Sequence, residues 1–448
     1  MKKIIKRRID AIRDVALDHH AKEILSKSAI AFILRIVGTG LAFLMQIVIG
    51  RYLGASGAGL YFLAFTITTL LATISMLGMD NSVTRFVAAH AVEKNWSKVG
   101  GVVSQALLLT IVVSVLMSVL LFFLADWVSI SLFNKPELAK PLLLMSFFIL
   151  PLSLVVIYTS ALQGLKYVRD VMLLQSVTTP AIALVAMYFF IPLFGLAGAV
   201  VSYGCGIVIT LVIGLLLWNR AKAVWGKILT HFSAKALLSS SITLLGAVLL
   251  QQIMMALPLL LLGVWGSSAD AGMFSAAQRT ASLIGLVLVS ANVIVAPKFA
   301  ELYQQNDIEA LGKVARQGAL LMTVMASPAL LLFLFVPEWV MGLFGAEFSA
   351  GWLLLVIMAL GQLVNVMTGS VGFILVMTGY EKQVFIAALW GGGINLLLCV
   401  ALIPPYGAVG AGVATSISIA SINLLRVRYV WKTIGVMPIP FIWRMQPR

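Results

Sequence analysis

Two arginines stand inside long apolar stretches of this sequence. Arg35 lies in the run 28–50 and Arg279 in the run 272–296. Within lipid, an ionised side chain is costly, and it usually has a functional role. A guanidinium stays charged and donates two parallel hydrogen bonds to a phosphate group. These positions therefore predict an anion-binding site, although either arginine could instead extend its side chain to the membrane surface.

Uncharged polar side chains accompany these arginines. Thr39 and Gln46 follow Arg35 by four and eleven residues, which places all three on one helical face. Isolated amides can bind a substrate, or they can join two helices by hydrogen bonds. We take these polar residues together as candidate substrate-binding residues: Arg35, Thr39, Gln46, Gln278, Arg279, Gln362 and Asn365.

The sequence offers little that could bind a metal or catalyse a reaction. Both cysteines lie in apolar runs, and the four histidines lack the spacing of zinc ligands, so we expect no metal and no cofactor. The expected external loops 125–140 and 337–350 carry scattered carboxylates, and the chain has no phosphate-binding Gly-Lys-Ser/Thr loop. We therefore expect no enzyme, and a membrane-embedded glycosyl transferase is the less favoured alternative.

Acidic residues are absent from the middle of the expected spans. Asp80 falls at the inner end of the second span, and the others fall in turns and loops. An exporter driven by protons or sodium ions would be expected to carry an intramembrane carboxylate. Buried cations without buried anions therefore favour an anionic substrate.

Composition and apolar runs predict an all-α integral membrane protein. The chain is 61% hydrophobic and only 10% charged, far from the balance of a soluble domain. A spanning helix needs about 20 mostly apolar residues. Twelve runs meet this requirement: 28–50, 59–79, 100–124, 141–162, 171–191, 195–217, 236–262, 272–296, 317–336, 350–378, 383–403 and 407–428.

Basic residues set the expected orientation. With both termini in the cytoplasm, 26 bases, Arg426 among them, lie on the inner side, and three, Arg51, Lys135 and Lys140, lie outside. This bias predicts a multi-pass protein of the cell (inner) membrane. It also explains the net charge of +15 without nucleic acid as a partner. The basic segment 1–27 is either a surface helix on anionic lipid or a topology signal.

The chain contains an internal repeat. IPLFGLAGA begins at Ile191, and IPPYGAVGA begins at Ile403, almost half a chain later. We call the separation of Ile191 and Ile403 the repeat offset. Six spans lie between the two phrases, so both halves have the same orientation and form parallel repeats. We expect an N-lobe (28–218), an amphipathic cytoplasmic linker (219–235), a C-lobe (236–428) and a cytoplasmic tail (429–448).

Several short motifs carry a family resemblance. They are Gly-Arg-Tyr-Leu-Gly at 50–54, Leu-Gly-Met-Asp-Asn at 77–81 and Arg-Phe-Val-Ala at 85–88. With twelve spans in two lobes, the chain resembles the oligosaccharide (O-antigen type) flippases of the multidrug/oligosaccharidyl-lipid/polysaccharide exporter superfamily.

That resemblance implies a fold and a function. It implies twelve transmembrane helices in two parallel six-helix lobes around a central cleft. The implied function is translocation of a polyprenyl-pyrophosphate-linked oligosaccharide to the outer leaflet by alternating access, for cell-surface polysaccharide or lipopolysaccharide biosynthesis. The implied partners are the lipid-linked oligosaccharide, membrane lipids and polysaccharide assembly proteins. A multidrug or small-molecule exporter of the same superfamily is the alternative.

Overall fold

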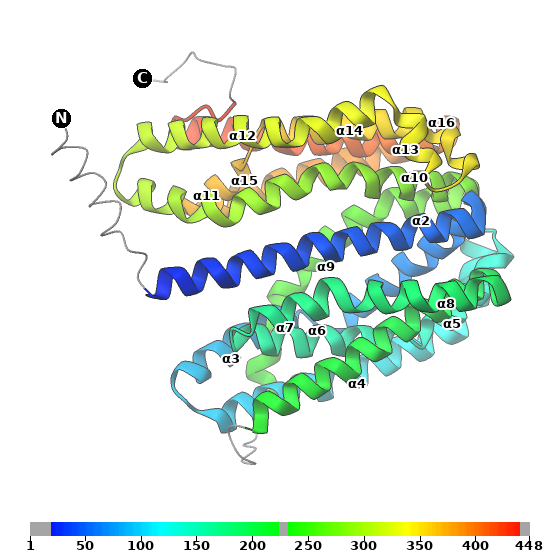
Figure 1. The fold of residues 1–448 in the computed structure, drawn as a ribbon, viewed down its shortest axis with the longest axis horizontal. Coiled ribbons are helices and arrows are strands. Elements are labelled where there is room, and N and C mark those ends of the chain that lie inside the picture. Colours follow the sequence, from blue (N-terminus) through cyan, green and yellow to red (C-terminus); the bar gives the residue numbers. More distant parts are fainter. Residues whose placement is uncertain (1–18, 224–231, 440–448) are drawn as a thin grey trace.

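The computed structural model describes residues 19–223 and 232–439, and their regular secondary structure is helical throughout (Figure 1). The first half of the chain forms α2 (His19–Ser75), α3 (Met79–Val92), α4 (Trp96–Trp127), α5 (Ala139–Ser146), α6 (Ile149–Gly164), α7 (Val168–Met172) and α8 (Thr178–Ala223). The second half forms α9 (Ala234–Trp265), α10 (Ser268–Ser282), α11 (Leu286–Gln304), α12 (Ile308–Phe335), α13 (Pro337–Gly342), α14 (Trp352–Met367), α15 (Val371–Met377) and α16 (Glu381–Ile434).

Three of these helices are too long to cross a bilayer once. A straight helix of 57 residues, the length of α2, would extend about 85 Å, whereas the hydrocarbon core is about 30 Å thick. Each long helix is broken at a glycine with positive φ: Gly54 in α2 (65°), Gly195 in α8 (55°) and Gly407 in α16 (52°). Glycine has no Cβ and adopts this positive φ without strain. Each long helix therefore contains two spans joined by a tight turn at its glycine, on the side predicted to be external.

The remaining spans are single helices or closely joined pairs. They are α4, the pair α5–α6 with a bend of 46°, α9, α10–α11, α12 and α14–α15. With the three broken helices, the chain crosses the membrane twelve times, as the hydropathy pattern predicts. α2 begins and α16 ends at the same end of the molecule (Figure 1), as an even number of spans requires.

The repeat in the sequence is also a repeat in backbone geometry. Gly195 has φ 55° and ψ −126°, and Gly407, which follows it at the repeat offset, has φ 52° and ψ −130°. Two six-span lobes in the same orientation follow. The expected segments 1–27, 219–235 and 429–448 lie partly outside the described residues, which leave out 1–18, 224–231 and 440–448.

The first span of the second half, α9, contacts both lobes. Near its inner end, Leu237 belongs to an apolar cluster of the first lobe, and the Ser241 carbonyl lies close to Gly78. Nearer the outer end, the Met254 carbonyl accepts a hydrogen bond from Asn395 Nδ2 of α16 at 3.4 Å. α9 therefore crosses from one lobe to the other as it traverses the membrane.

Candidate functional site

Arg279 lies where the two lobes meet. It is eleven residues from the start of α10 at Ser268, which places it about 16 Å from the outer end of that helix. Its guanidinium carbon lies 4.6 Å from the ring centre of Phe62 and 5.6 Å from that of Phe65, both on α2. Aromatic faces attract a cation at such distances. The cation of the second lobe therefore rests on rings of the first.

The Arg279 guanidinium has no hydrogen-bond or carboxylate partner among the described residues. Tyr61 and Tyr203 are close enough to interact with it electrostatically. The Tyr61 hydroxyl is buried without a partner in the described chain, and so is the hydroxyl of Ser275, one turn from Arg279 on α10. Unpaired buried polar groups are costly. A phosphate at this position would give these donors an acceptor.

The aromatic residues around Arg279 form a connected group from two helices. Tyr61 stacks on Phe65 with ring centres 6.3 Å apart, and Phe65 meets Tyr203 of α8 edge to face at 5.3 Å. These aromatic residues are not among the candidates that the sequence predicts. The spacing of Tyr61, Phe62 and Phe65 on one helix was a signal, but aromatic residues are common in apolar spans. Only their position against Arg279 makes them candidates.

The candidates on the first span lie in two environments. Arg35 is exposed, and the Thr39 hydroxyl donates to the Arg35 carbonyl at 2.8 Å within the helix. Gln46 is buried, and its side-chain oxygen has no partner among the described residues. Eleven residues of helix separate Arg35 from Gln46, or about 16 Å. Gln46 lies at a depth similar to that of Arg279, and Arg35 lies nearer the cytoplasm.

The remaining candidates form a separate hydrogen-bonded group. Asn365 Nδ2 donates to Gln362 Oε1 at 3.1 Å, and Asn423 Nδ2 of α16 donates to Asn365 Oδ1 at 3.0 Å. Gln362 also lies near Gly285, six residues inward of Arg279. These amides join α14 to α16, which fits the helix-joining alternative. Gln278 is half-buried beside Arg279.

Arg426 is an additional half-buried cation, which the base count predicts on the cytoplasmic side. Three residues beyond Asn423 on α16, it packs against Gly372 of α15, and its Nε atom is buried without a partner among the described residues. The apolar run was expected to end near this residue, whereas α16 continues to Ile434 and carries Arg426 into the lobe. Hydropathy alone could not show that this side chain points inward.

The outer ends of the two lobes are tightly closed. A Cβ on Gly59 of α2 would overlap the Ser268 carbonyl, and one on Gly272 of α10 would overlap the Ala55 carbonyl. Both helices approach this closely because both positions are glycine. A path to Arg279 from outside therefore requires α2 and α10 to separate.

Two charged residues fasten this outer closure. Lys135 Nζ donates to the Gly263 and Gly266 carbonyls at 2.6 and 2.8 Å, at the C-terminal end of α9. Glu347 accepts from the Ala55 amide at 2.9 Å, directly after the break in α2. A cation at a helix C-terminus and an anion at a helix N-terminus are both favourable. Burial lowers the pKa of Lys135, and the negative charge of Asp270 partly offsets this effect.

These two contacts are related by the repeat. Lys135 and Glu347 are separated by the same repeat offset as the two turn phrases. Each comes from the loop between the third and fourth spans of its own lobe, and each reaches the first hairpin of the other lobe. Arg51 adds a third cross-lobe contact, because its Nε donates to the Leu343 carbonyl at 2.8 Å. We call Lys135, Glu347 and Arg51 the outer clamp.

Comparison with known proteins agrees with this architecture. Stage V sporulation protein B of Bacillus subtilis (strain 168) is 21% identical over 428 residues, covering 88% of this chain and 81% of that protein. A structure of the lipid II flippase MurJ, inward closed, aligns with a TM-score of 0.72 at 17% identity, over 91% of this chain and 87% of that one.

A second solved structure has the same fold. The inward-facing conformation of a multidrug resistance MATE family transporter of the MOP superfamily also aligns with a TM-score of 0.72, at 16% identity, over 90% of this chain and 98% of that one. Both of those structures are inward conformations. The family model described as polysaccharide biosynthesis protein matches residues 24–303, most of the chain. This chain is therefore a member of the polysaccharide biosynthesis protein family.

Proposed function

We propose that this protein flips a polyprenyl-pyrophosphate-linked oligosaccharide from the cytoplasmic to the outer leaflet by alternating access. It acts as a transporter in cell-surface polysaccharide biosynthesis, together with the assembly proteins of that process, and not as an enzyme. Family membership and the fold shared with a lipid II flippase support this proposal. The observation that carries it is the Arg279 guanidinium, held at the lobe interface without a carboxylate partner among the described residues.

Charge positions suggest an order of events. The exposed Arg35 meets the pyrophosphate first, on the cytoplasmic side, while the lipid tail stays in the bilayer. The headgroup then moves outward by roughly 16 Å to Arg279. Planar guanidinium groups suit phosphate oxygens at both stops. Opening of the outer clamp then exposes the headgroup to the outside.

Export of a small molecule is the second candidate, because the fold matches a multidrug transporter equally well. In the described part of the chain, carboxylates lie at helix ends and in loops, for example Asp80 at the start of α3 and Asp270 at the start of α10. Near Arg279, a cationic drug would therefore meet a half-buried guanidinium that has no carboxylate partner among the described residues. This charge pattern favours the anionic lipid-linked substrate.

Substitutions of Arg279 test the proposal. Purified variants are placed in vesicles with a fluorescent polyprenyl-pyrophosphate sugar, and its appearance in the opposite leaflet is timed with an impermeant quencher. Loss of one charge-assisted contact costs about 1.5–3 kcal/mol, so Arg279→Ala should flip ten- to a hundredfold more slowly. Arg279→Lys should keep part of the activity, because it keeps the charge.

Controls make the result decisive. Arg220→Ala removes an exposed base at the inner end of α8 and should leave the rate unchanged. Membrane levels of every variant are compared. Full flipping activity in Arg279→Glu would reject the anion-site role. Transport of a cationic dye without movement of the lipid-linked sugar would favour the exporter.

The base distribution also supports an inner-membrane location with both termini in the cytoplasm. A cysteine at Glu137, exposed in the loop after α4, should react with an impermeant thiol reagent outside intact cells. One at Asn306, exposed between α11 and α12, should react only after lysis. The reverse pattern would invert the proposed orientation.

A further inference from the structure

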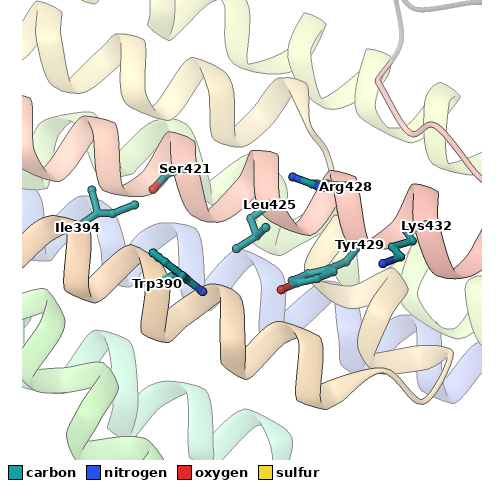
Figure 2. A pocket seen from close by; sticks show the side chains of 7 residues that line it. All are labelled: Trp390, Ile394, Ser421, Leu425, Arg428, Tyr429 and Lys432. Atoms are coloured by element: carbon teal, nitrogen blue, oxygen red, sulfur yellow. The ribbon is translucent and has the colours of Figure 1, made fainter.

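The inner end of the second lobe holds a groove that the proposed transport path does not use. It has a volume of about 480 Å³ and lies between the two halves of α16. Trp390 and Ile394 come from the first half, and Leu425, Arg428 and Lys432 come from the second (Figure 2). Its lining includes no residue of α2 or α10, the helices that surround Arg279.

The charged residues of the groove lie near its inner end, and deeper its lining is apolar apart from the hydroxyl of Ser421. Lys432 and Arg428 lie two and six residues from the inner end of α16 at Ile434, or about 3 and 9 Å along the axis. Trp390 lies about 14 Å from the other inner end, at Glu381, and Ile394 about 20 Å. A phospholipid has the same sequence of groups, with its phosphate at the surface and its acyl chains deeper.

The charges in the groove are free to bind an anion. Arg428 and Lys432 are exposed, and the lining contains no acidic residue. Neither base forms a salt bridge with any residue that the structure describes. The opposite face of the helix, with Val427 and Val430, is buried in the lobe. The groove face is therefore the outward face of this span.

We propose that this groove binds an anionic phospholipid of the inner leaflet. The phosphate lies between Arg428 and Lys432, and an acyl chain follows Leu425 and Ile394 past the Trp390 ring. Basic pockets between spans on the cytoplasmic side bind anionic headgroups in this way. The bound lipid would hold the two halves of α16 together at their inner ends.

The repeat supplies an internal comparison. At the repeat offset, Thr178 corresponds to Trp390 and Leu216 corresponds to Arg428, whereas Arg220 corresponds to Lys432. The first lobe therefore lacks the aromatic ring and one of the two cations. The site belongs to the second lobe alone.

Binding of phosphatidylglycerol to the purified protein tests the proposal. Each basic side chain near an anionic surface contributes about fivefold in affinity, so the Arg428→Gln/Lys432→Gln double variant should bind it roughly 30-fold more weakly. The matched control, Arg220→Gln/Lys222→Gln, removes two bases at the inner end of α8 and should bind normally. Neutral phosphatidylcholine should bind weakly to all proteins.

Three outcomes would overturn the proposal. They are equal binding by the wild type and the groove variant, equal losses in the groove variant and its control, and equal affinity for the two phospholipids. Binding of a polyprenyl pyrophosphate, but not of phosphatidylglycerol, at Arg428 and Lys432 would assign the groove to the transported substrate instead. Arg279→Ala should retain phosphatidylglycerol binding, so failure of the proposed transport function would be seen separately.

Discussion

Replacing Lys135 by glutamine should open the outer side of the protein. The Nζ atom of Lys135 joins the first lobe to the Gly263 and Gly266 carbonyls of the second. Glutamine is shorter than lysine and uncharged. Its side chain therefore does not reach the two carbonyl oxygens and is not attracted to the negative C-terminal end of α9. The closed state of this end, in which these contacts exist, should become less populated.

The magnitude follows from the two cross-lobe hydrogen bonds at 2.6 and 2.8 Å. A hydrogen bond to a charged group contributes about 1.5–3 kcal/mol. Ordering the lysine side chain costs about 1.5–2 kcal/mol, and water hydrates the carbonyls when the clamp opens. A net change of about 2 kcal/mol is expected, which shifts the ratio of protein open at this end to protein closed at this end roughly 30-fold.

A cysteine at Ser275 can report this shift. Ser275 is 1% exposed on the face of α10 that meets α2, and the substitution changes little volume. The native Cys205 and Cys399 are first replaced by alanine. An impermeant thiol reagent outside intact cells then reacts at a rate proportional to the open population. Lys135→Gln should raise that rate roughly 30-fold.

The control is Lys140→Gln, which removes an exposed lysine a few residues from Lys135. It should leave the labelling rate at Ser275→Cys unchanged. Equal rates in the wild type, Lys135→Gln and Lys140→Gln would refute the reasoning, because the clamp would then contribute nothing to closure. An equal rise in both variants would point to the external charge and not to the hydrogen bonds.

Three further predictions concern closure, the broken helices and the driving force. In the same assay, Gly59→Ala or Gly272→Ala should speed labelling of the cysteine at Ser275, because the added Cβ prevents α2 and α10 from packing together. Gly246 has no atom near its Cβ position, so Gly246→Ala should leave the labelling rate unchanged. In thermal unfolding, Gly195→Ala should lower the free energy of unfolding by about 1–3 kcal/mol, because a φ of 55° strains an L-residue. Gly393 is helical and has no atom near its Cβ position, so Gly393→Ala should leave the free energy of unfolding unchanged. In vesicles, collapsing the membrane potential should slow flipping, because a charge gains about 2.3 kcal/mol per 100 mV; a rate set by the pH gradient alone would contradict this.

The spans and their order follow from local properties of the sequence. Each span satisfies its own backbone hydrogen bonds within lipid, so about 20 apolar residues predict a crossing regardless of the rest of the chain. The glycines at the external turns are equally local, since a positive φ at Gly195 or Gly407 favours glycine. Twelve crossings and the repeat were therefore accessible without coordinates, whereas the orientation stays a prediction from the basic residues.

The site depends on contacts between spans, and local sequence does not determine these. Arg279 was identifiable as a cation within a span, but Phe62 and Phe65 lie in the other half of the chain, and only packing of α10 on α2 brings their rings to it. Arg426 likewise looked like a base at the membrane surface, and its burial depends on α15. Hydropathy predicts that a side chain enters the membrane. Which neighbour it meets there depends on how the helices pack, and only the tertiary structure decides that.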